Sequence, residues 1–337
     1  MTNLAVTLDD RYTFDDGRIY VTGTQALVRL MLVQRRRDEA QGLNTAGFVS
    51  GYRGSPMTTI DQELWRAKDH LESHHINFWP AVNEHMAATA VWGTQQVHYH
   101  NDARYDGVFG MWYGKGPGLD QSLDAVRQAN YHGTAKNGGV LVLAGDDPAM
   151  RSTVDAYHSE LLFEDLLMPV LYPADIQEVL DMGLYGIAMS RFSGAWLGYK
   201  LLPETIETAA SIRAGYDDLK IEIPEFEFPA DGVNSRNGDM WFNQENRIRR
   251  FKLPAAVAFA RANKLNRVTH DSGNARFGIA AMGKTWRDTL QALNELGLDE
   301  NRLQQLGVRI LKVAMPFPVD NETYREFAEG LEEILVI

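Results

Sequence analysis

Along residues 20–213, segments with helical spacing of apolar residues alternate with short, continuous apolar runs. We expect Thr22 to cap the first helix, which ends near Gly42. The apolar runs predict strands over 48–52, 78–82, 107–111, 140–144, 168–171 and 195–199. The expected helices cover 57–71, 119–131, 159–167 and 175–189, and a further helix starts at Glu84. This alternation predicts right-handed βαβ units and an α/β fold with a doubly wound parallel sheet.

Residues 214–274 break this alternation. The segment 221–229 has alternating apolar residues, but its prolines favour an extended or edge conformation. Basic and aromatic residues follow at 241–251, and an alanine-rich helix is expected at 254–264. We interpret 214–274 as a connector between two domains that lies on the protein surface.

The alternation resumes after Arg276. It predicts strands at 277–282, 308–313 and 334–337, and helices at 284–296 and 321–329. The expected organisation is an N-terminal extension at 1–19, a first domain at 20–213, the connector, and a smaller α/β domain at 275–337. Because the sequence stops inside an apolar strand, we expect the smaller domain to be incomplete.

The amino-acid composition limits which cofactors, metals and partners the chain can bind. Its 337 residues include no cysteine, which excludes disulfides, thiolate zinc sites and iron–sulfur clusters ligated within this sequence. The net charge of −12 argues against nucleic acid or an anionic membrane as the main partner. The polar N-terminus is unlike a secretory signal, and no apolar run reaches the roughly 18 residues that span a bilayer. We expect a soluble, cytoplasmic protein.

Three turns follow predicted strands, at residues 51–56, 82–85 and 113–118. Ligands of open parallel sheets bind outside the carboxyl ends of the strands, so these turns are expected to meet at one edge. Residues 110–116 superficially resemble a phosphate loop, but the spacing is one residue short and Gly116 replaces the Ser or Thr that holds magnesium. This excludes a nucleoside triphosphatase. A glycine turn that lets the backbone approach a ligand or another subunit stays open.

Glu84 opens a helix directly after an apolar strand. A carboxylate there is ordinarily a favourable partner of the helix dipole, and spacing alone favours that reading. Gly145-Asp146-Asp147-Pro148 also follows a strand, where a polar turn is favoured over a metal site. No HExxH pattern occurs among the histidines, so no metal ligands are expected.

The order and spacing of three motifs resemble those of 2-oxoacid:ferredoxin oxidoreductases. The motifs are Tyr52-Arg53-Gly54-Ser55-Pro56, Asn83-Glu84-His85-Met86-Ala87-Ala88 and Gly145-Asp146-Asp147-Pro148. Within that family the chain resembles the N-terminal part of the long, fused bacterial indolepyruvate ferredoxin oxidoreductases. The resemblance covers nearly all of residues 15–337, including Val313-Ala314-Met315-Pro316-Phe317-Pro318. It implies a domain that binds the aminopyrimidine of thiamine diphosphate, followed by a transketolase-C-like domain.

The resemblance gives Glu84 the role of catalytic carboxylate. Hydrogen-bonded to N1′ of the pyrimidine, it favours the imino tautomer, whose nitrogen removes the thiazolium C2 proton. Glu84, Gly54, Ser55 and Trp79 are then the expected cofactor-binding residues. Ser55 matches the position of a threonine in the Tyr-Pro-x-Thr-Pro turn of the pyruvate enzymes. Trp79 belongs to an apolar wall expected around the carboxylate, with Val82, Met86 and Trp92.

The resemblance also suggests where a 2-oxoacid would bind. Arg53 and Ser55 are candidates for its carboxylate, and Trp112 and Tyr113 for an aromatic wall around an aryl group, although a core or interface role for the two aromatics stays open. The family's Mg²⁺ motif, Gly-Asp-Gly, does not occur in the sequence. We therefore expect Mg²⁺ and [4Fe-4S] clusters only in parts of the enzyme outside this chain, and no metal-binding residue within it.

The resemblance implies oxidative decarboxylation of an aryl 2-oxoacid such as indolepyruvate, with thiamine diphosphate as cofactor, coenzyme A as acyl acceptor and ferredoxin as electron acceptor. The chain alone is expected to be inactive, and a homodimer is expected because thiamine sites usually form between domains or subunits. Two alternatives remain. The chain could be an incomplete fragment that acts only in dimerisation or docking, or it could come from another thiamine enzyme, such as a decarboxylase or synthase. The transketolase-C-like domain disfavours decarboxylases, whose middle domain differs.

Overall fold

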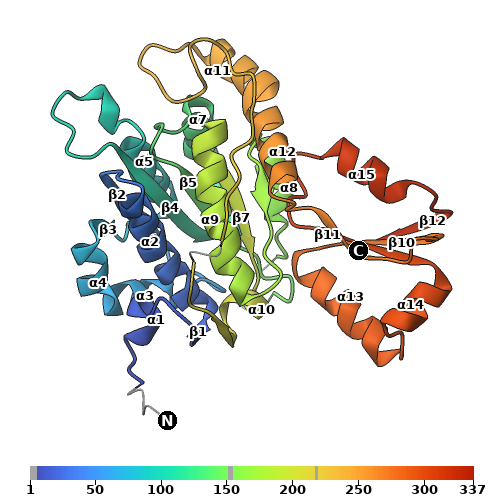
Figure 1. Ribbon diagram of the computed structural model, residues 1–337. Helices are drawn as coiled ribbons and strands as arrows, with labels where there is room; N and C mark the ends of the chain where they lie inside the picture. The colour runs from blue at the N-terminus through green and yellow to red at the C-terminus, as the bar shows by residue number, and fades with distance from the viewer. Residues whose placement is uncertain (1–5, 151–154, 217–218) are drawn as a thin grey trace.

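A six-stranded parallel sheet forms the centre of the larger part of the molecule (Figure 1). The computed structural model describes residues 6–150, 155–216 and 219–337. The strands lie in the order β3-β2-β4-β5-β7-β6. Their bounds are β2 (Thr45–Gly51), β3 (Ile76–Phe78), β4 (Gly107–Lys115), β5 (Val140–Gly145), β6 (Val170–Leu171) and β7 (Leu197–Leu201). The expected doubly wound parallel sheet is confirmed.

Helices cover both faces of this sheet, each over its own apolar cluster. One face carries α2 (Gly23–Ala40), α3 (Ile60–Arg66), α4 (Lys68–Ser73) and α9 (Ile176–Ser193). The other carries α5 (Glu84–Thr94), α7 (Leu123–His132) and α8 (Ser159–Asp165). Thr22 caps α2 as expected, because its hydroxyl accepts from the Gln25 amide at 3.2 Å while the Gln25 side chain accepts from the Thr22 amide at 3.1 Å.

Several boundaries differ from the sequence pattern. The helix expected at 57–71 divides at Ala67 into α3 and α4, and the one at 119–131 divides at Ser122 into α6 (Gly116–Gln121) and α7. The strand expected at 78–82 lies earlier, at Ile76–Phe78, and shares only Phe78 with that range; Pro80 lacks the N–H that a ladder needs. Short elements that the pattern missed are α1 (Asp10–Thr13), β1 (Arg18–Thr22), η1 (Val97–Tyr99), α10 (Pro203–Ile206) and β8 (Ala209–Arg213); β1 and β8 pair antiparallel.

A smaller four-stranded sheet follows, in the order β12-β10-β11-β9. Its strands are β9 (Arg267–Asp271), β10 (Phe277–Met282), β11 (Val308–Val313) and β12 (Glu333–Val336). The helices are α13 (Gly283–Glu295), α14 (Glu300–Leu306) and α15 (Asn321–Ala328). In Figure 1, α13 and α14 lie on one side of this sheet and α15 on the other. The predicted α/β character is confirmed, and β9 adds an antiparallel strand from within the stretch interpreted as connector.

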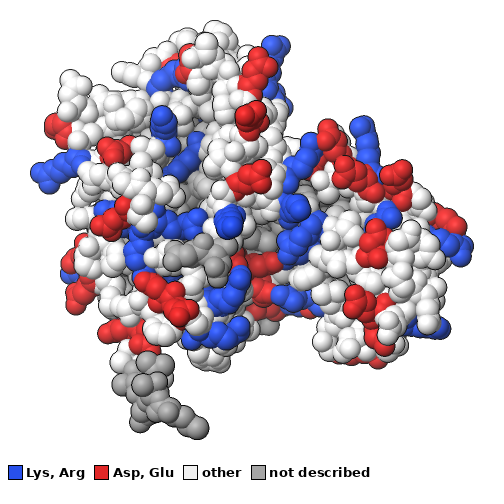
Figure 2. Space-filling view, viewed as in Figure 1, with Lys and Arg blue, Asp and Glu red and all other residues white. Residues whose placement is uncertain are grey.

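The two sheets are joined by backbone and charged contacts at the β6 edge. The Tyr172 amide donates to the Ala314 carbonyl at 2.9 Å, and the Val170 amide donates to the Phe317 carbonyl at 2.7 Å. Lys312 forms an ion pair with Glu178 across the same junction. Acidic and basic side chains both occur across the face shown in Figure 2. No helix among residues 6–150, 155–216 and 219–337 is long and apolar enough to cross a membrane.

The connector is only partly a surface segment. It contains α11 (Trp241–Arg247), a π-helical turn (η2, Ile248–Lys252) and α12 (Leu253–Ala262), which follow one another without a break. The expectation that this stretch lies on the surface is wrong for α12. This helix packs against α9 and buries an apolar stripe at helical spacing, made of Ala255, Ala256, Phe259 and Ala260.

Lys252, at the end of the π-helical turn, is fully buried. Its Nζ donates to the Asn130 carbonyl at 3.4 Å and lies against Gly133, where a Cβ would be 2.5 Å away. Burial lowers the pKa of the Lys252 amine to about 7, Arg247 lowers it further and Asp239 opposes the shift. The folded protein therefore keeps this amine in surroundings that disfavour its charged form.

The low pKa of Lys252 predicts a pH dependence of stability. Between about pH 7 and 10.5 the folded chain binds fewer protons than the unfolded chain, so the free energy of unfolding rises with pH in that window and gains nothing below it. Relative to Lys252→Met, the wild type is expected to gain several kcal/mol between these limits, at ~1.4 kcal/mol per pH unit. Urea unfolding at several pH values measures this gain, with Lys68→Met, an exposed lysine, as control. Parallel pH curves for wild type and Lys252→Met would contradict a buried neutral amine.

Candidate functional site

The three predicted turns meet at the carboxyl edge of the large sheet. The Tyr52 amide donates to the Tyr113 carbonyl at 3.1 Å, and the Ala81 amide donates to the Gly51 carbonyl at 3.3 Å. The chain leaves β2 toward β3 and leaves β4 toward β5, although β2 and β4 are neighbours. Ligands of open α/β sheets bind at such a reversal of strand order. The candidate site therefore lies at the carboxyl ends of β2 and β4.

Glu84 lies at this edge, as the first residue of α5. Asn83 caps the helix by accepting from the Met86 amide at 2.8 Å. Glu84 is 7% exposed, and within the described residues its carboxylate accepts no hydrogen bond and forms no ion pair. Buried carboxylates are normally paired or hydrogen-bonded. The carboxylate is therefore available to a group that the described residues do not provide.

Two glycines make room for the Glu84 side chain. A Cβ on Gly118 would lie 2.5 Å from Oε1 of Glu84, and a Cβ on Gly114 would lie 3.4 Å from its Cγ. Any larger residue at position 118 would displace the carboxylate. Gly114 near the end of β4 and Gly118 in the first turn of α6 thus permit a close approach, and the group that approaches is the side chain of Glu84.

Trp112 and Tyr113 are core residues and do not line an open pocket. Both have no exposed surface, and they point to opposite faces of β4, Trp112 into the cluster under α5 and Tyr113 into the cluster under α2. The Trp112 indole N–H donates to the Glu84 carbonyl at 3.0 Å, and the Tyr113 hydroxyl donates to Asp61. In this structure both rings serve as core packing, the alternative that the sequence left open, because helices cover both faces of β4. Trp112 instead fixes the start of α5.

The turn at 53–56 lies across the ends of β4 and β5. A Cβ on Gly54 would meet the Lys115 side chain at 2.8 Å, and a Cβ on Gly145 would meet Pro56 and Met57 at the same distance. Ser55 is half-buried and Arg53 is exposed. The structure thus brings Gly54 and Ser55 to the same edge as Glu84, while Arg53 extends toward solvent.

Apolar side chains surround the start of α5 on the outside of the molecule. Trp79, Val82 and Met86 are 44%, 73% and 45% exposed. The Trp79 ring lies 6.5 Å from the ring of Phe48. Trp92 does not join them: it lies about two helical turns from Glu84 along α5, and its indole N–H donates to His132 at 3.0 Å. Three of the four residues expected as an apolar wall therefore form an exposed patch beside Glu84.

The Gly145-Asp146-Asp147-Pro148 segment behaves as a polar turn. Asp146 accepts hydrogen bonds from the amide and hydroxyl of Ser159 at 3.0 and 2.9 Å, and Lys200 Nζ lies 3.4 Å away. Burial raises the pKa of Asp146, while Lys200 opposes the shift. Within the described parts of the chain, no group of three His, Cys, Asp or Glu residues is arranged to hold a metal ion.

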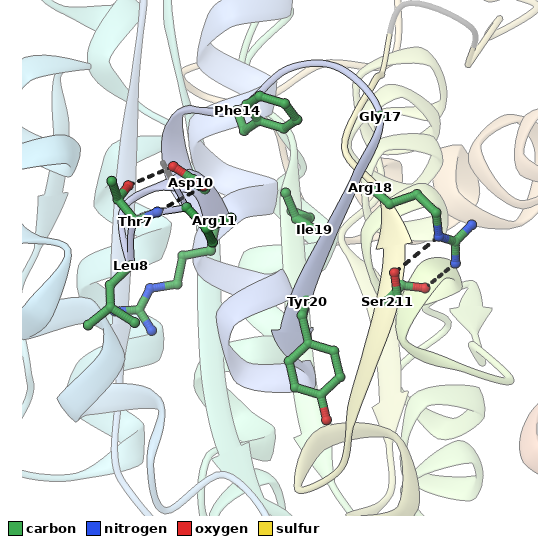
Figure 3. A pocket seen from close by; sticks show the side chains of 11 residues that line it. Thr7, Leu8, Asp10, Arg11, Phe14, Gly17, Arg18, Ile19, Tyr20 and Ser211 are labelled. Carbon is green, nitrogen blue, oxygen red and sulfur yellow. Dashed lines mark hydrogen bonds between the residues drawn. The ribbon is translucent and has the colours of Figure 1, made fainter. Parts of the chain in front are cut away.

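A pocket of about 750 Å³ lies between α1, β1 and β8 (Figure 3). It is lined by apolar side chains such as Leu8, Phe14 and Ile19, while the Arg18 guanidinium is held by Ser211 through its hydroxyl at 3.0 Å and its carbonyl. None of the predicted site residues lines this pocket. It is separate from the Glu84 site.

Two solved structures share this α/β fold. The 2-oxoglutarate:ferredoxin oxidoreductase from Magnetococcus marinus, solved with 2-oxoglutarate, coenzyme A and succinyl-CoA bound, aligns with a TM-score of 0.66 and 16% identity over 96% of this chain and 58% of that chain. Transketolase from Campylobacter jejuni aligns with a TM-score of 0.50 and 12% identity over 98% of this chain and 45% of that chain. At these identities the similarity establishes the fold alone.

Sequence comparisons are more specific. Residues 267–337 match the indolepyruvate oxidoreductase domain family. The chain is 25% identical to the indolepyruvate oxidoreductase subunit IorA of Pyrococcus abyssi, over 95% of this chain and 45% of that protein. It is 24% identical to the IorA subunit of Methanothermobacter marburgensis, over 98% of this chain and 48% of that protein. The chain thus spans less than half the length of these curated relatives. The resemblance that the motifs indicated, to indolepyruvate oxidoreductases, is confirmed.

Proposed function

We propose that this chain supplies the pyrimidine-binding half of a thiamine diphosphate site in an indolepyruvate-type 2-oxoacid oxidoreductase. The observation that carries the proposal is Glu84 at the sheet's carboxyl edge: the residue is only 7% exposed, and its carboxylate has no protein partner among the described residues. A heterocyclic nitrogen that can share a proton is the partner such a carboxylate lacks. The names of the relatives support an oxidoreductase, and their fold supports a cofactor at this edge.

The residues at the edge fit the aminopyrimidine. Gly114 and Gly118 keep the space beside the Glu84 side chain free of Cβ atoms. Close by, Gly54 offers a backbone without a side chain, and Ser55 offers a half-buried hydroxyl. Trp79 adds an exposed aromatic surface at the end of β3. When bound, thiamine diphosphate supplies the nucleophilic carbon and the electron sink that decarboxylation of a 2-oxoacid requires.

Glu84 acts by holding a proton between its carboxylate and the pyrimidine ring nitrogen. Low exposure weakens the competition of water for that proton and strengthens the hydrogen bond. The Trp112 indole N–H holds the backbone of Glu84 at the start of α5, so the carboxylate stays at one position. Ser55 donates its hydroxyl near the cofactor and the substrate carboxylate, and Arg53 offers a guanidinium to the same carboxylate from the solvent side.

We infer that the substrate is an aryl 2-oxoacid such as indolepyruvate, with coenzyme A as acyl acceptor and ferredoxin as electron acceptor. The exposed apolar patch of Trp79, Val82 and Met86 supports contact with a second domain or subunit that completes the site. Since the sequence contains neither cysteine nor Gly-Asp-Gly, Mg²⁺ and [4Fe-4S] clusters would be held by that second part of the enzyme. A homodimer is the assembly we propose, located in the cytoplasm.

Dye reduction by the complete enzyme tests this function. A panel of indolepyruvate, phenylpyruvate, pyruvate and 2-oxoglutarate is assayed with and without coenzyme A, and with and without added thiamine diphosphate. We expect reduction that depends on thiamine diphosphate and is fastest with the two aryl substrates. Reduction that proceeds equally without thiamine diphosphate, or only with a non-aryl acid, would contradict the proposal.

A further inference from the structure

Lys115 is a cation at the site edge that the proposed function leaves without a role. It is the last residue of β4 and is half-buried. The Cδ, Cγ and Cβ atoms of Lys115 lie against Gly54, where a Cβ would be 2.8, 3.1 and 3.3 Å away. The stem of Lys115 therefore crosses the turn that contains Ser55, and only glycine at position 54 leaves room for it.

No described residue neutralises the Lys115 ammonium. Within the described residues it donates no hydrogen bond and forms no ion pair. Lys200, at the same edge of the sheet, shows the contrast, because it is paired with Glu160 and lies 3.4 Å from Asp146. A cation whose stem is fixed by packing and whose charge is unpaired is suited to bind an anionic ligand.

Lys115 and Glu84 approach the edge from opposite faces of β4. Side chains alternate along a strand, so Gly114 faces Glu84 under α5 while Lys115 faces the turn at Gly54. Their charged atoms are more than 4.0 Å apart, because no ion pair joins them. Because the carboxylate of Glu84 and the ammonium of Lys115 do not neutralise each other, each can bind a different group of the bound cofactor and substrate.

We propose that Lys115 binds the carboxylate of the 2-oxoacid substrate and thereby selects anionic over neutral carbonyl compounds. This inference rests on the proposed function. The 2-oxoacid carries one negative charge next to its carbonyl carbon, and Glu84 at the same edge would repel that charge without a nearby cation. Arg53 is also unpaired within the described residues, but its exposure leaves it in higher dielectric, where the attraction is weaker.

Binding of an unreactive analogue tests Lys115 without relying on turnover. The complete enzyme, loaded with thiamine diphosphate, is titrated with 3-phenyllactate and with its neutral amide, 3-phenyllactamide, by calorimetry. Lys115→Gln is expected to weaken phenyllactate binding about 10- to 100-fold, as loss of a charge-assisted hydrogen bond would, and to leave the amide within about twofold. Lys115→Arg is expected to restore part of the affinity. The KM for phenylpyruvate should rise with the dissociation constant of phenyllactate while the dissociation constant of thiamine diphosphate stays unchanged.

Lys136→Gln is the matched control, since Lys136 is exposed in the loop before β5, at the opposite end of the strands. Equal phenyllactate affinity in wild type and Lys115→Gln would overturn the role of Lys115, and so would equal weakening of the acid and the amide. Failure of the wild type to bind phenyllactate at all would overturn the proposed function itself. Circular dichroism of the variant confirms folding in either case.

Discussion

Replacing Glu84 with glutamine in the complete enzyme is expected to lower oxoacid-dependent dye reduction by about 100-fold or more, the range found for lost general acid–base catalysis. Glutamine keeps the size of the side chain between Gly114 and Gly118, but it cannot share a proton with the pyrimidine nitrogen. The fold should survive, because the charge at the start of α5 contributes only about 0.3–1 kcal/mol through the helix dipole. Steady-state kinetics and thermal unfolding measure the two effects separately.

Glu72→Gln is the control for Glu84→Gln. Glu72 lies on α4 with a side chain that is 63% exposed, so its substitution removes the same charge from the surface. We expect turnover within about twofold of the wild type, as is usual for exposed positions. Near-normal turnover of Glu84→Gln would contradict a chemical role of this carboxylate, and Glu84 would then act only as an acidic residue at the helix start.

Adding one methyl group at Gly118 is expected to slow the enzyme strongly although Glu84 itself is unchanged. The new Cβ would lie 2.5 Å from Oε1 of Glu84, closer than any van der Waals contact, so the carboxylate must move. A displacement of about 1 Å costs on the order of 100-fold in rate where geometry is decisive. We therefore expect Gly118→Ala to lower kcat/KM by about 10- to 100-fold while the protein remains folded.

Gly93→Ala provides the matched glycine substitution. Gly93 lies on α5, the helix of Glu84, and a Cβ there would meet nothing within 4 Å. Alanine favours helix over glycine by about 0.8–1 kcal/mol, so this variant should be as active as the wild type and slightly more stable. If Gly118→Ala were equally active, the carboxylate would have another position from which it works, and the role assigned to the glycines would be wrong.

The sequence predicts those parts of the fold that a single local rule determines, such as helix capping or the alternation of strands and helices. Thr22 caps the first helix as predicted, because its side chain accepts a free amide of the first turn; Asn83 caps α5 in the same way, a role that was not predicted. The alternation of apolar runs and helical patterns specifies the parallel sheet, and the location of the turns after strands places Glu84, Gly54 and Ser55 at one edge. Element ends were less well predicted, because Pro80, Ala67 and Ser122 interrupt patterns that remain apolar beyond them.

The assignment of aromatic residues could not be made from the pattern alone. Trp112 and Tyr113 are consecutive on β4, so one of them must face each side, and only the structure shows that both sides are covered by helices. The burial of α12 likewise depends on the tertiary contact with α9. Sequence reasoning left open whether the glycines at 113–118 let the backbone approach a ligand or another subunit. It could not identify Glu84 as the neighbour, because the two segments are separated by most of α5, the loop after it and β4.

The role of Lys115 was hidden by a different feature. The residue stands inside a sequence that resembles a phosphate loop and fails its spacing, so rejecting the phosphate loop left the lysine unexplained. Lys115 is the last residue of β4 and contacts Gly54 in the turn after the neighbouring strand β2, and no local sequence pattern reveals such a contact.

A structure of the complete enzyme with thiamine diphosphate bound tests the central claim most directly. The account predicts that a carboxylate oxygen of Glu84 lies within hydrogen-bonding reach, about 2.6–3.2 Å, of the N1′ atom of the aminopyrimidine, with Gly114 and Gly118 on either side of the side chain. A pyrimidine bound elsewhere, or a Glu84 carboxylate turned to solvent in the presence of the cofactor, would contradict it.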